Sequence, residues 1–188
     1  MPLPLELEAI PDWITSQFVR AGVDRKSNLK WPVFVTSSDE TGVSGRVVVL
    51  RRFDPVNQLA SIYTDKRSTK IKAISSNNQV ELVFFDPKQM LQIRARGSAR
   101  FHLDGPKKET ILDALSDRSL SDYATVMAPG ADLLRCEPER AVERARDNFA
   151  LIEVAIEELD VLSLVRSGHR RVKMQRNDGT YRASWVVP

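Results

Sequence analysis

The stretch "MLQIRARGSARFHL", residues 90–103, alternates apolar and polar residues along almost its whole length. A period of two is typical of a β-strand that buries one face and exposes the other. The stretch therefore predicts one long, half-buried strand. Its apolar face consists of Leu91, Ile93, Ala95, Gly97, Ala99 and Phe101, and its polar face of Gln92, Arg94, Arg96, Ser98 and Arg100.

Further runs along the chain are also strand-like, with many β-branched or aromatic residues between turn residues. They are residues 32–38, 45–53, 58–65, 79–86, 149–156, 160–166, 169–176 and 180–188. Asn177, Asp178 and Gly179 form a strong hairpin signal between the last two runs. So many strands with short turns favour an antiparallel barrel, because full closure removes exposed strand edges. The expected fold class is mainly β with peripheral helices (α+β).

Three regions show helical patterns. Residues 67–78 predict a short helix with Ser68 as N-cap and Asn77–Asn78 at its end. Residues 106–146 predict helices over 106–119, 120–128 and 137–149, with a loop at 127–133 and Pro138 at a helix start. Without repeats or a linker, the chain is predicted to be a single domain over residues 1–188, with the helical segment 1–30 packed on it. In that segment the residues at helical spacing are Ile10, Trp13, Ile14, Phe18 and Ala21.

The composition of the 188 residues is that of an ordinary globular protein, with 42% hydrophobic and 28% charged residues. A net charge of +3 suits anionic ligands but is far from the dense basic face of nucleic-acid binding proteins. No apolar run approaches the roughly 20 residues that span a bilayer, and the first residues do not resemble a signal peptide. We therefore expect a soluble, cytoplasmic protein that binds neither nucleic acid nor membrane.

Motifs for metal binding or nucleophilic catalysis are missing from the sequence. Two histidines, His102 and His169, and the single Cys136 are too few and too scattered for a zinc site. His169 in "SGHRR" is therefore read, from the residues alone, as an exposed histidine beside a basic turn. The sequence indicates no metal, and it leaves the catalytic residues unknown.

The segment "YTDKRSTKIKA", residues 63–73, places Lys66, Arg67 and Lys70 and several hydroxyl groups where a strand is predicted to become a helix. One interpretation is an anion site, since a helix N-terminus presents unpaired N–H groups and a positive dipole end. The other is a solvated surface turn, and the segment alone favours it. Arg46 and Arg51 flank "VVVL" at an odd separation, so a single strand would send them to opposite faces unless a bulge intervenes.

Several short motifs in order carry a family resemblance. They are "RVVVLR" at 46–51, "YT" at 63–64, "STK" at 68–70, a strand glutamine at 92, "HRR" at 169–171 and the terminal "WVVP". From about residue 32 onward the chain resembles the pyridoxamine 5'-phosphate oxidase family of FMN-binding split-barrel proteins. The resemblance implies an antiparallel FMN-binding split β-barrel, FMN as cofactor, and a homodimer with the flavin at the subunit interface.

The resemblance also implies roles for individual residues. The anion expected at residues 63–73 becomes the FMN phosphate, with Arg46 as a second phosphate ligand, and Gln92 matches a glutamine that hydrogen-bonds the flavin ring. The cofactor-binding set is Arg46, Val47, Val48, Val49, Leu50, Arg51, Tyr63, Thr64, Ser68, Thr69, Lys70, Gln92 and Arg171, and the substrate-binding set is Arg51, Arg118 and His169.

The chain departs from the family pattern mainly at the substrate. Ser167 stands where the family has an arginine that contacts the pyridoxal substrate, with Arg166 one step out of register, and Leu159–Leu162 replace a tryptophan. Arg51 replaces a lysine and Thr69 an arginine. The pattern indicates a retained cofactor site and an eroded substrate site.

The favoured hypothesis is an FMN-dependent oxidoreductase of unidentified substrate and electron acceptor. The alternatives are a flavin carrier or sensor without turnover, a true pyridoxamine or pyridoxine 5'-phosphate oxidase, and a basic nucleic-acid-binding barrel, which the mild charge disfavours.

Overall fold

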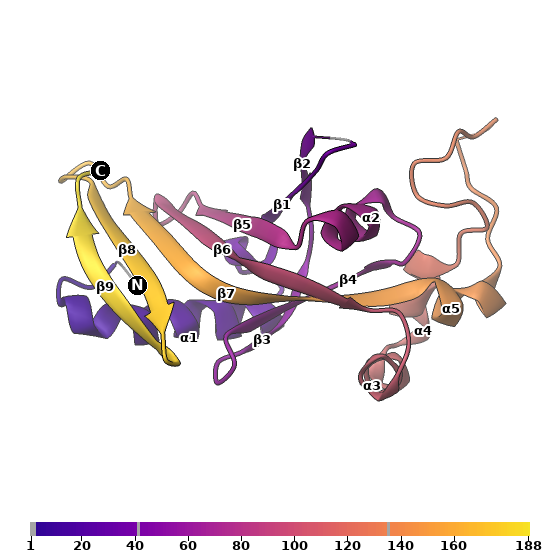
Figure 1. Cartoon of the computed structure of the whole chain (residues 1–188), viewed down its shortest axis with the longest axis horizontal. Helices are drawn as coiled ribbons and strands as arrows, with labels where there is room; N and C mark the ends of the chain where they lie inside the picture. Colours follow the sequence, from indigo (N-terminus) through magenta and orange to yellow (C-terminus); the bar gives the residue numbers. More distant parts are fainter. Residues whose placement is uncertain (1–2, 41, 135) are drawn as a thin grey trace.

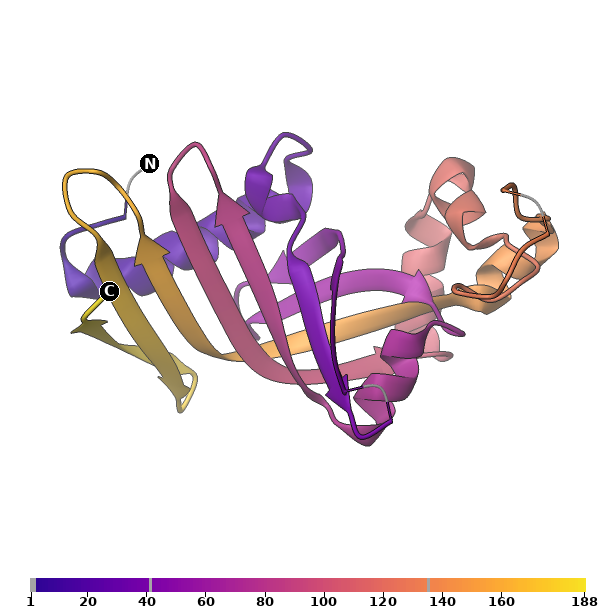
Figure 2. The same ribbon diagram turned by 90° about the horizontal axis from the view of Figure 1, so that it is seen from above.

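The computed structural model describes residues 3–40, 42–134 and 136–188. Nine antiparallel strands form one curled sheet with helices around it (Figures 1 and 2). The strands are β1 (Val33–Ser38), β2 (Gly42–Val47), β3 (Leu50–Asp54), β4 (Leu59–Asp65), β5 (Gln79–Asp86), β6 (Leu91–His102), β7 (Phe149–Ser163), β8 (Arg170–Asn177) and β9 (Thr180–Val186). The helices are α1 (Ile10–Val23), α2 (Thr69–Ser76), α3 (Pro106–Ala114), α4 (Asp117–Leu120) and α5 (Ala145–Asn148), with 3-10 turns at Leu7–Ala9, Asn28–Lys30, Ser121–Tyr123 and Val142–Arg144.

Strand β7 is the centre of the sheet, and the sheet forks at it. One edge of β7 pairs with β6 along most of its length, whereas the other edge pairs with β4 near its beginning and with β8 near its end. The strands therefore follow the path β2-β1-β5-β6-β7-β4-β3, and β8 and β9 form a separate branch. The fork separates two ends of the molecule, one with β8 and β9 and the other with α2 to α5 (Figure 1).

The alternation predicted over residues 90–103 is confirmed by β6. Leu91, Ile93, Ala95 and Ala99 are all buried in the main core. Gly97 lies where the pairing register of β6 against β7 shifts, and a Cβ atom there would stand 1.8 Å from the carbonyl oxygen of Ala155. Only glycine fits so close a backbone approach.

Helix α1 covers the core as predicted, and its five residues at helical spacing, Ile10, Trp13, Ile14, Phe18 and Ala21, are buried. The Phe18 ring packs against Phe53 of β3 and Phe84 of β5, with centroid distances of 5.1 and 4.9 Å. The other confirmed elements are α2, which begins directly after Ser68, and the β8–β9 hairpin, whose Asp178 and Gly179 both have positive φ. On the part of the chain that the structure describes, no helix is long and apolar enough to cross a membrane.

The prediction of one strand over residues 45–53 is wrong. The run divides at Val48 and Val49 into β2, which pairs with β1, and β3, which pairs with β4. The Val48 amide still donates to the carbonyl of Pro32 (2.9 Å), one residue before β1 begins. The parity argument for Arg46 and Arg51 therefore does not apply, since the two residues lie on different strands. β2 and β3 stand at the two ends of the strand path, so the split-barrel sheet is not closed by hydrogen bonds, contrary to the expected full closure.

Two other boundary predictions fail for tertiary reasons. Residues 149–156 and 160–163 belong to one strand, β7, because its charged stretch still pairs with β6 and β8, and residues 164–166 lie beyond its end. The helices expected over 120–128 and 137–149 shrink to short turns, since Arg140 forms a β-bridge with Thr125. The helix expected over 106–119 ends at Ala114, and α4 starts anew after Ser116, whose side chain accepts from the Ser119 amide.

Candidate functional site

Lys70, Thr64 and Ser68 come together where β4 leads into α2. Lys70 Nζ donates to Thr64 Oγ1 (2.8 Å) and to Ser68 Oγ (3.2 Å), and the two hydroxyls lie 3.3 Å apart. Ser68 occupies the N-cap position of α2, but its side chain makes no capping hydrogen bond. The first amides of α2 therefore keep their capacity to donate to an external acceptor.

Arg46 approaches the same place from β2. Its Nη1 donates to Thr36 Oγ1 (2.8 Å) and to the Phe34 carbonyl (3.2 Å), and its Nη2 donates to Ser44 Oγ (2.8 Å). These contacts hold the guanidinium with neutral partners only. Arg46, Thr64, Ser68 and Lys70 are called the α2 cluster below.

The electrostatics of the α2 cluster are unusual for two cations. Burial lowers the pKa of Lys70, and the charge of Arg46 lowers it further, while Asp65 acts weakly in the opposite direction. Burial also lowers the pKa of Arg46. Among the described residues, neither cation forms an ion pair with a carboxylate, although partly buried charges are normally compensated.

Lys66 and Arg67, which precede Lys70 in the segment 63–73, have partners outside the α2 cluster. Lys66 pairs with Asp147 (2.6 Å), and Arg67 forms a bidentate pair with Asp65 while donating to the carbonyls of Thr125 (2.9 Å) and Val126 (2.8 Å). Thr69, the first residue of α2, is exposed. Of the three cations that the sequence offered for an anion, only Lys70 faces the cluster.

Arg51 on β3 lies against aromatic rings rather than in the α2 cluster. Its guanidinium carbon is 5.5 Å from the centroid of the Tyr63 ring, and its Nε is buried with no hydrogen-bond partner in the described structure. The ring of Phe149 contacts both Tyr63 and Tyr123. Burial raises the pKa of Tyr123 to about 12, against the charge of Arg51, so its phenol stays neutral.

The backbone between Arg46 and Arg51 connects β2 and β3, the two strands at the ends of the strand path. Val47 ends β2 and is exposed, Val48 and Val49 cross over, and Leu50 begins β3 in the core. The predicted cofactor residues 46–51, 63–64 and 68–70 are thus neighbours at one end of the molecule.

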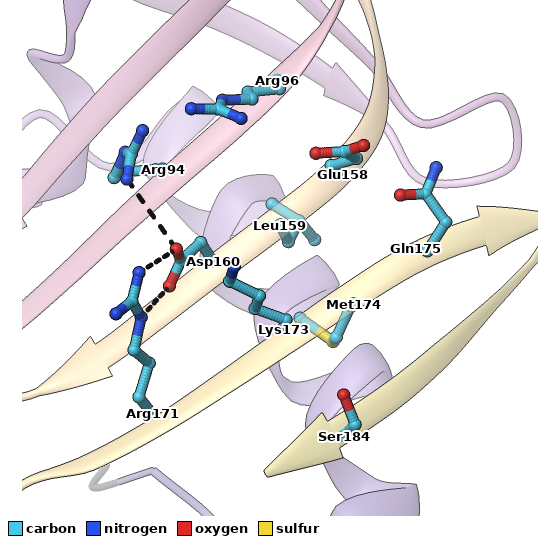
Figure 3. Close-up of a pocket in the computed structure, with 10 residues that line it drawn as sticks. All are labelled: Arg94, Arg96, Glu158, Leu159, Asp160, Arg171, Lys173, Met174, Gln175 and Ser184. Carbon is cyan, nitrogen blue, oxygen red and sulfur yellow. Dashed lines mark hydrogen bonds and ion pairs between the residues drawn. The ribbon is translucent and has the colours of Figure 1, made fainter. Parts of the chain in front are cut away.

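Gln92 and Arg171 lie at the other end. Both pair across Leu162 of β7, Gln92 from β6 and Arg171 from β8. Arg171 donates to both carboxylate oxygens of Asp160 (2.8 and 2.7 Å), and Arg94 lies 3.8 Å from the same group (Figure 3). Arg94, Asp160 and Arg171 line a pocket of about 390 Å³, called the β8 pocket. Its other lining residues are Arg96, Glu158, Leu159, Lys173, Met174, Gln175 and Ser184.

One chain cannot bring its two ends onto one small ligand. Thr64 pairs with Ala150 and Gln92 with Leu162, and these two residues are twelve apart on β7. At about 3.3 Å per residue, the separation is roughly 40 Å along the strand.

The predicted substrate residues are divided in the same way. Arg118 is exposed on α4, at the end of the molecule with α3 and α5 (Figure 1). His169 is exposed in the turn before β8, next to Ser167 and Arg166, which are exposed as well.

Sequence reasoning missed two kinds of residue. Thr36 and Ser44, which hold Arg46, are ordinary strand residues without any motif, although a threonine in an apolar run is a weak signal of a buried hydroxyl. Tyr123, which lines a second cavity, was also missed, as was the role of Arg67 in holding the backbone of Thr125 and Val126 beside that cavity. In the described ranges, no group of three or more His, Cys, Asp and Glu side chains could hold a metal ion.

Part of the chain matches the model of a known protein family. Residues 15–103 match the model of the family described as pyridoxamine 5'-phosphate oxidase, FMN-binding domain. The family resemblance is confirmed. The matched segment includes the whole α2 cluster and Gln92. No curated protein matches the chain.

Solved structures show the same split-barrel fold. A pyridoxamine 5'-phosphate oxidase-related, FMN-binding protein of Nostoc punctiforme is 19% identical, with a TM-score of 0.73 over 94% of this chain and 96% of that one. PhzG of Burkholderia lata, solved with tetrahydrophenazine-1-carboxylic acid, is 15% identical, with a TM-score of 0.72 over 98% of this chain and 94% of that one. At these identities, the likeness shows the fold alone.

Proposed function

We propose that this chain binds FMN through the α2 cluster and acts as an FMN-dependent oxidoreductase. The observation that carries the proposal is the pair of partly buried cations, Arg46 and Lys70, which lack a carboxylate partner in the described structure. A phosphate would compensate both charges and would accept from the free amides of α2. The family match over residues 15–103 supports the same ligand.

The chain's residues would bind and orient the cofactor. Arg46, Ser68 and Lys70 would hold the phosphate, and Tyr63 with the backbone of residues 47–50 would lie along the rest of the molecule. Bound FMN supplies a ring that accepts a hydride from the substrate. The catalytic residues remain unassigned, so the roles proposed for the chain's residues are binding and orientation of the cofactor.

We also propose that the protein is a homodimer with the flavin between the subunits. Gln92 and Arg171 lie too far along β7 from Lys70 to reach the same flavin within one chain, so a second copy would supply them. A suitable apolar surface is exposed on neighbouring strands. Val43 and Val47 of β2 are 77% and 63% exposed, and Val33 of β1 and Phe85 of β5 are exposed near them.

The phosphate assignment is tested by comparing FMN with riboflavin, which lacks the phosphate. Arg46→Ala and Lys70→Ala should each weaken FMN binding by about 1.5 to 3 kcal/mol, the usual value of a charged hydrogen bond, with little effect on riboflavin. Lys72→Ala is the matched control, because Lys72 is an exposed residue of the same helix. Equal losses for both flavins would remove the α2 cluster from the phosphate site.

The dimer is tested by sedimentation at micromolar concentration. A sedimenting species of twice the chain mass is expected, with FMN bound. A flavin-loaded monomer would contradict the shared site.

A flavin carrier or sensor without turnover is the second candidate. It is favoured by the exposed, scattered positions of Arg118, Ser167 and His169, which offer little to a phosphorylated substrate. The protein with FMN should oxidise pyridoxamine 5'-phosphate poorly, and Ser167→Arg should raise the rate. Robust wild-type activity that collapses in Arg166→Ala would instead identify an ordinary oxidase, and a flavin that no substrate reduces would favour the carrier.

A further inference from the structure

A cavity of about 420 Å³, here the Tyr63 pocket, lies directly beside the α2 cluster. Thr64 belongs to both, since it lines the pocket and accepts from Lys70. A ligand in this pocket would therefore be a neighbour of a flavin held at the cluster. The lining residues are Tyr63, Thr64, Asp65, Asp122, Tyr123, Thr125, Met127, Ala128, Pro129, Gly130, Ala131, Leu133 and Pro138.

The lining is unsuited to a phosphorylated ligand. Among the described residues it contains no Lys, Arg or His, and the wall formed by residues 127–133 and Pro138 is largely apolar. Of its two carboxylates, Asp65 is already paired with Arg67, and Asp122 is exposed. A phosphate dianion placed here would lose its hydration without gaining a cation.

The aromatic residues give the pocket a fixed shape. Phe149 packs edge-on against Tyr63, with centroids 5.2 Å apart, and against Tyr123, with centroids 5.1 Å apart and the rings at 90°. Arg51 covers the Tyr63 ring. Rings fixed in this way favour flat ligands, which can stack on them with little reorganisation.

The opposite wall is tied down by side chains that have no other role in the site. Arg67 donates to the carbonyls of Thr125 and Val126, and Asn148 Nδ2 donates to the carbonyls of Tyr123 (2.8 Å) and Thr125 (3.3 Å). The wall is therefore formed before any ligand arrives. In the sequence, Arg67 lies between Thr64 and Ser68, which both belong to the proposed cofactor site. The short segment 63–70 would therefore position both the flavin and the ligand of the Tyr63 pocket.

We propose that the Tyr63 pocket is the substrate site and that it takes a flat, largely apolar ring compound without a phosphate group. The Tyr123 hydroxyl would hydrogen-bond a hydroxyl or carbonyl group on that ring. The assignment as substrate site rests on the proposed FMN site next to it. It departs from a phosphorylated pyridoxal-type substrate, which would need cations that the pocket lacks.

The test uses two probes that differ only in the phosphate, 2-naphthol and 2-naphthyl phosphate, with binding followed by naphthalene fluorescence anisotropy. The full chain loaded with FMN should bind 2-naphthol at least tenfold more tightly. Equal binding, or tighter binding of the phosphate ester, would overturn the proposal.

A pair of variants locates the binding. Ala131→Trp places a large ring in the pocket and should reduce 2-naphthol binding at least tenfold, whereas Leu134→Trp, at a fully exposed position outside the lining, should leave it unchanged. Equal effects of the two variants, or none, would overturn the location.

Flavin fluorescence on the same proteins separates this proposal from the proposed function. Ala131→Trp should keep the FMN affinity of the wild type. A wild type that binds 2-naphthol in this pocket but no FMN would overturn the proposed function, and with it the pocket's assignment as substrate site. A wild type that binds FMN and no naphthalene would overturn the pocket alone.

Discussion

The α2 cluster and the β8 pocket are both rich in cations, but only the β8 pocket supplies its own anions. There, Arg171 has Asp160, and Arg94 and Arg96 share Glu81 at 2.6 to 3.1 Å. In the α2 cluster, the partners of Arg46 and Lys70 among the described residues are hydroxyl and carbonyl groups. A cation already paired holds the fold together, whereas an uncompensated and partly buried cation indicates an anionic ligand.

The pKa shifts of the two regions reflect this difference. Hydrogen bonds from Arg171 lower the pKa of Asp160 and thereby stabilise its charged form. Burial lowers the pKa of Lys70 and thereby destabilises its charged form. Charge removal should consequently affect folding in opposite directions at the two ends of β7.

The largest expected effect is that of Lys70→Met. FMN affinity should fall about 10- to 150-fold, while the ligand-free protein becomes no less stable, because an unpaired, partly buried charge has been replaced by an apolar chain. Isothermal titration and urea unfolding provide the two measurements. Lys72→Met serves as control, and a clear loss of stability on Lys70→Met would make the cluster structural.

The matching change in the β8 pocket is Asp160→Asn. It leaves Arg171 and Arg94 without their shared carboxylate, so the free energy of unfolding should fall by about 1 to 3 kcal/mol. Urea unfolding of the ligand-free protein measures this. If Asp160→Asn and Lys70→Met changed stability in the same direction, the contrast between the regions would be wrong.

The pH dependence of stability should differ between the two ends. The folded-state pKa of Lys70 is below its ordinary 10.5, so the unfolded chain binds more protons and stability rises with pH between these two values. Comparing wild type with Lys70→Met isolates this rise, and bound FMN should abolish it. The folded-state pKa of Asp160 is below 3.8, so its contribution is present above pH 3.8 and is lost as the pH falls through the folded-state value.

The smallest expected effect is that of Thr69→Arg. Thr69 is exposed at the start of α2, where the family resemblance places an arginine, so the substitution adds a cation near the proposed phosphate. Because exposed charges are screened by water, FMN affinity should rise only a few-fold. Titration at two salt concentrations checks it, and a gain that survives high salt would mean a buried contact instead.

The elements that sequence predicted well are those with a local cause. The alternation in β6, the helical spacing in α1 and the Asp178–Gly179 turn need no information from the rest of the chain. The break after Val47 could not be predicted, because Val48 and Val49 continue a β-branched run and the change of partner from β1 to β4 depends on other segments of the chain.

The same limit applies to the site. Lys66, Arg67 and Lys70 look alike in the sequence, and their roles depend on distant partners. Asp147 is 81 residues from Lys66, and Thr125 is 58 residues from Arg67. The family resemblance grouped Lys70 with Thr64 and Ser68, which it contacts, but neither the resemblance nor the pattern could assign Arg67 to the support of a neighbouring pocket.

The two-residue connector Val48–Val49 has a consequence for the order of folding. The hairpins β1–β2 and β3–β4 form from adjacent residues, yet β5, β6 and β7 lie between them in the sheet. β4 pairs on its other edge only with β7, which is synthesised much later. Residues 15–103, the segment that matches the FMN-binding family, include β1 to β6 but not β7, so β4 and β6 would each lack a neighbour. We therefore expect that segment, expressed alone, not to fold, and a nascent chain to form the proposed flavin site only after β7 has left the ribosome.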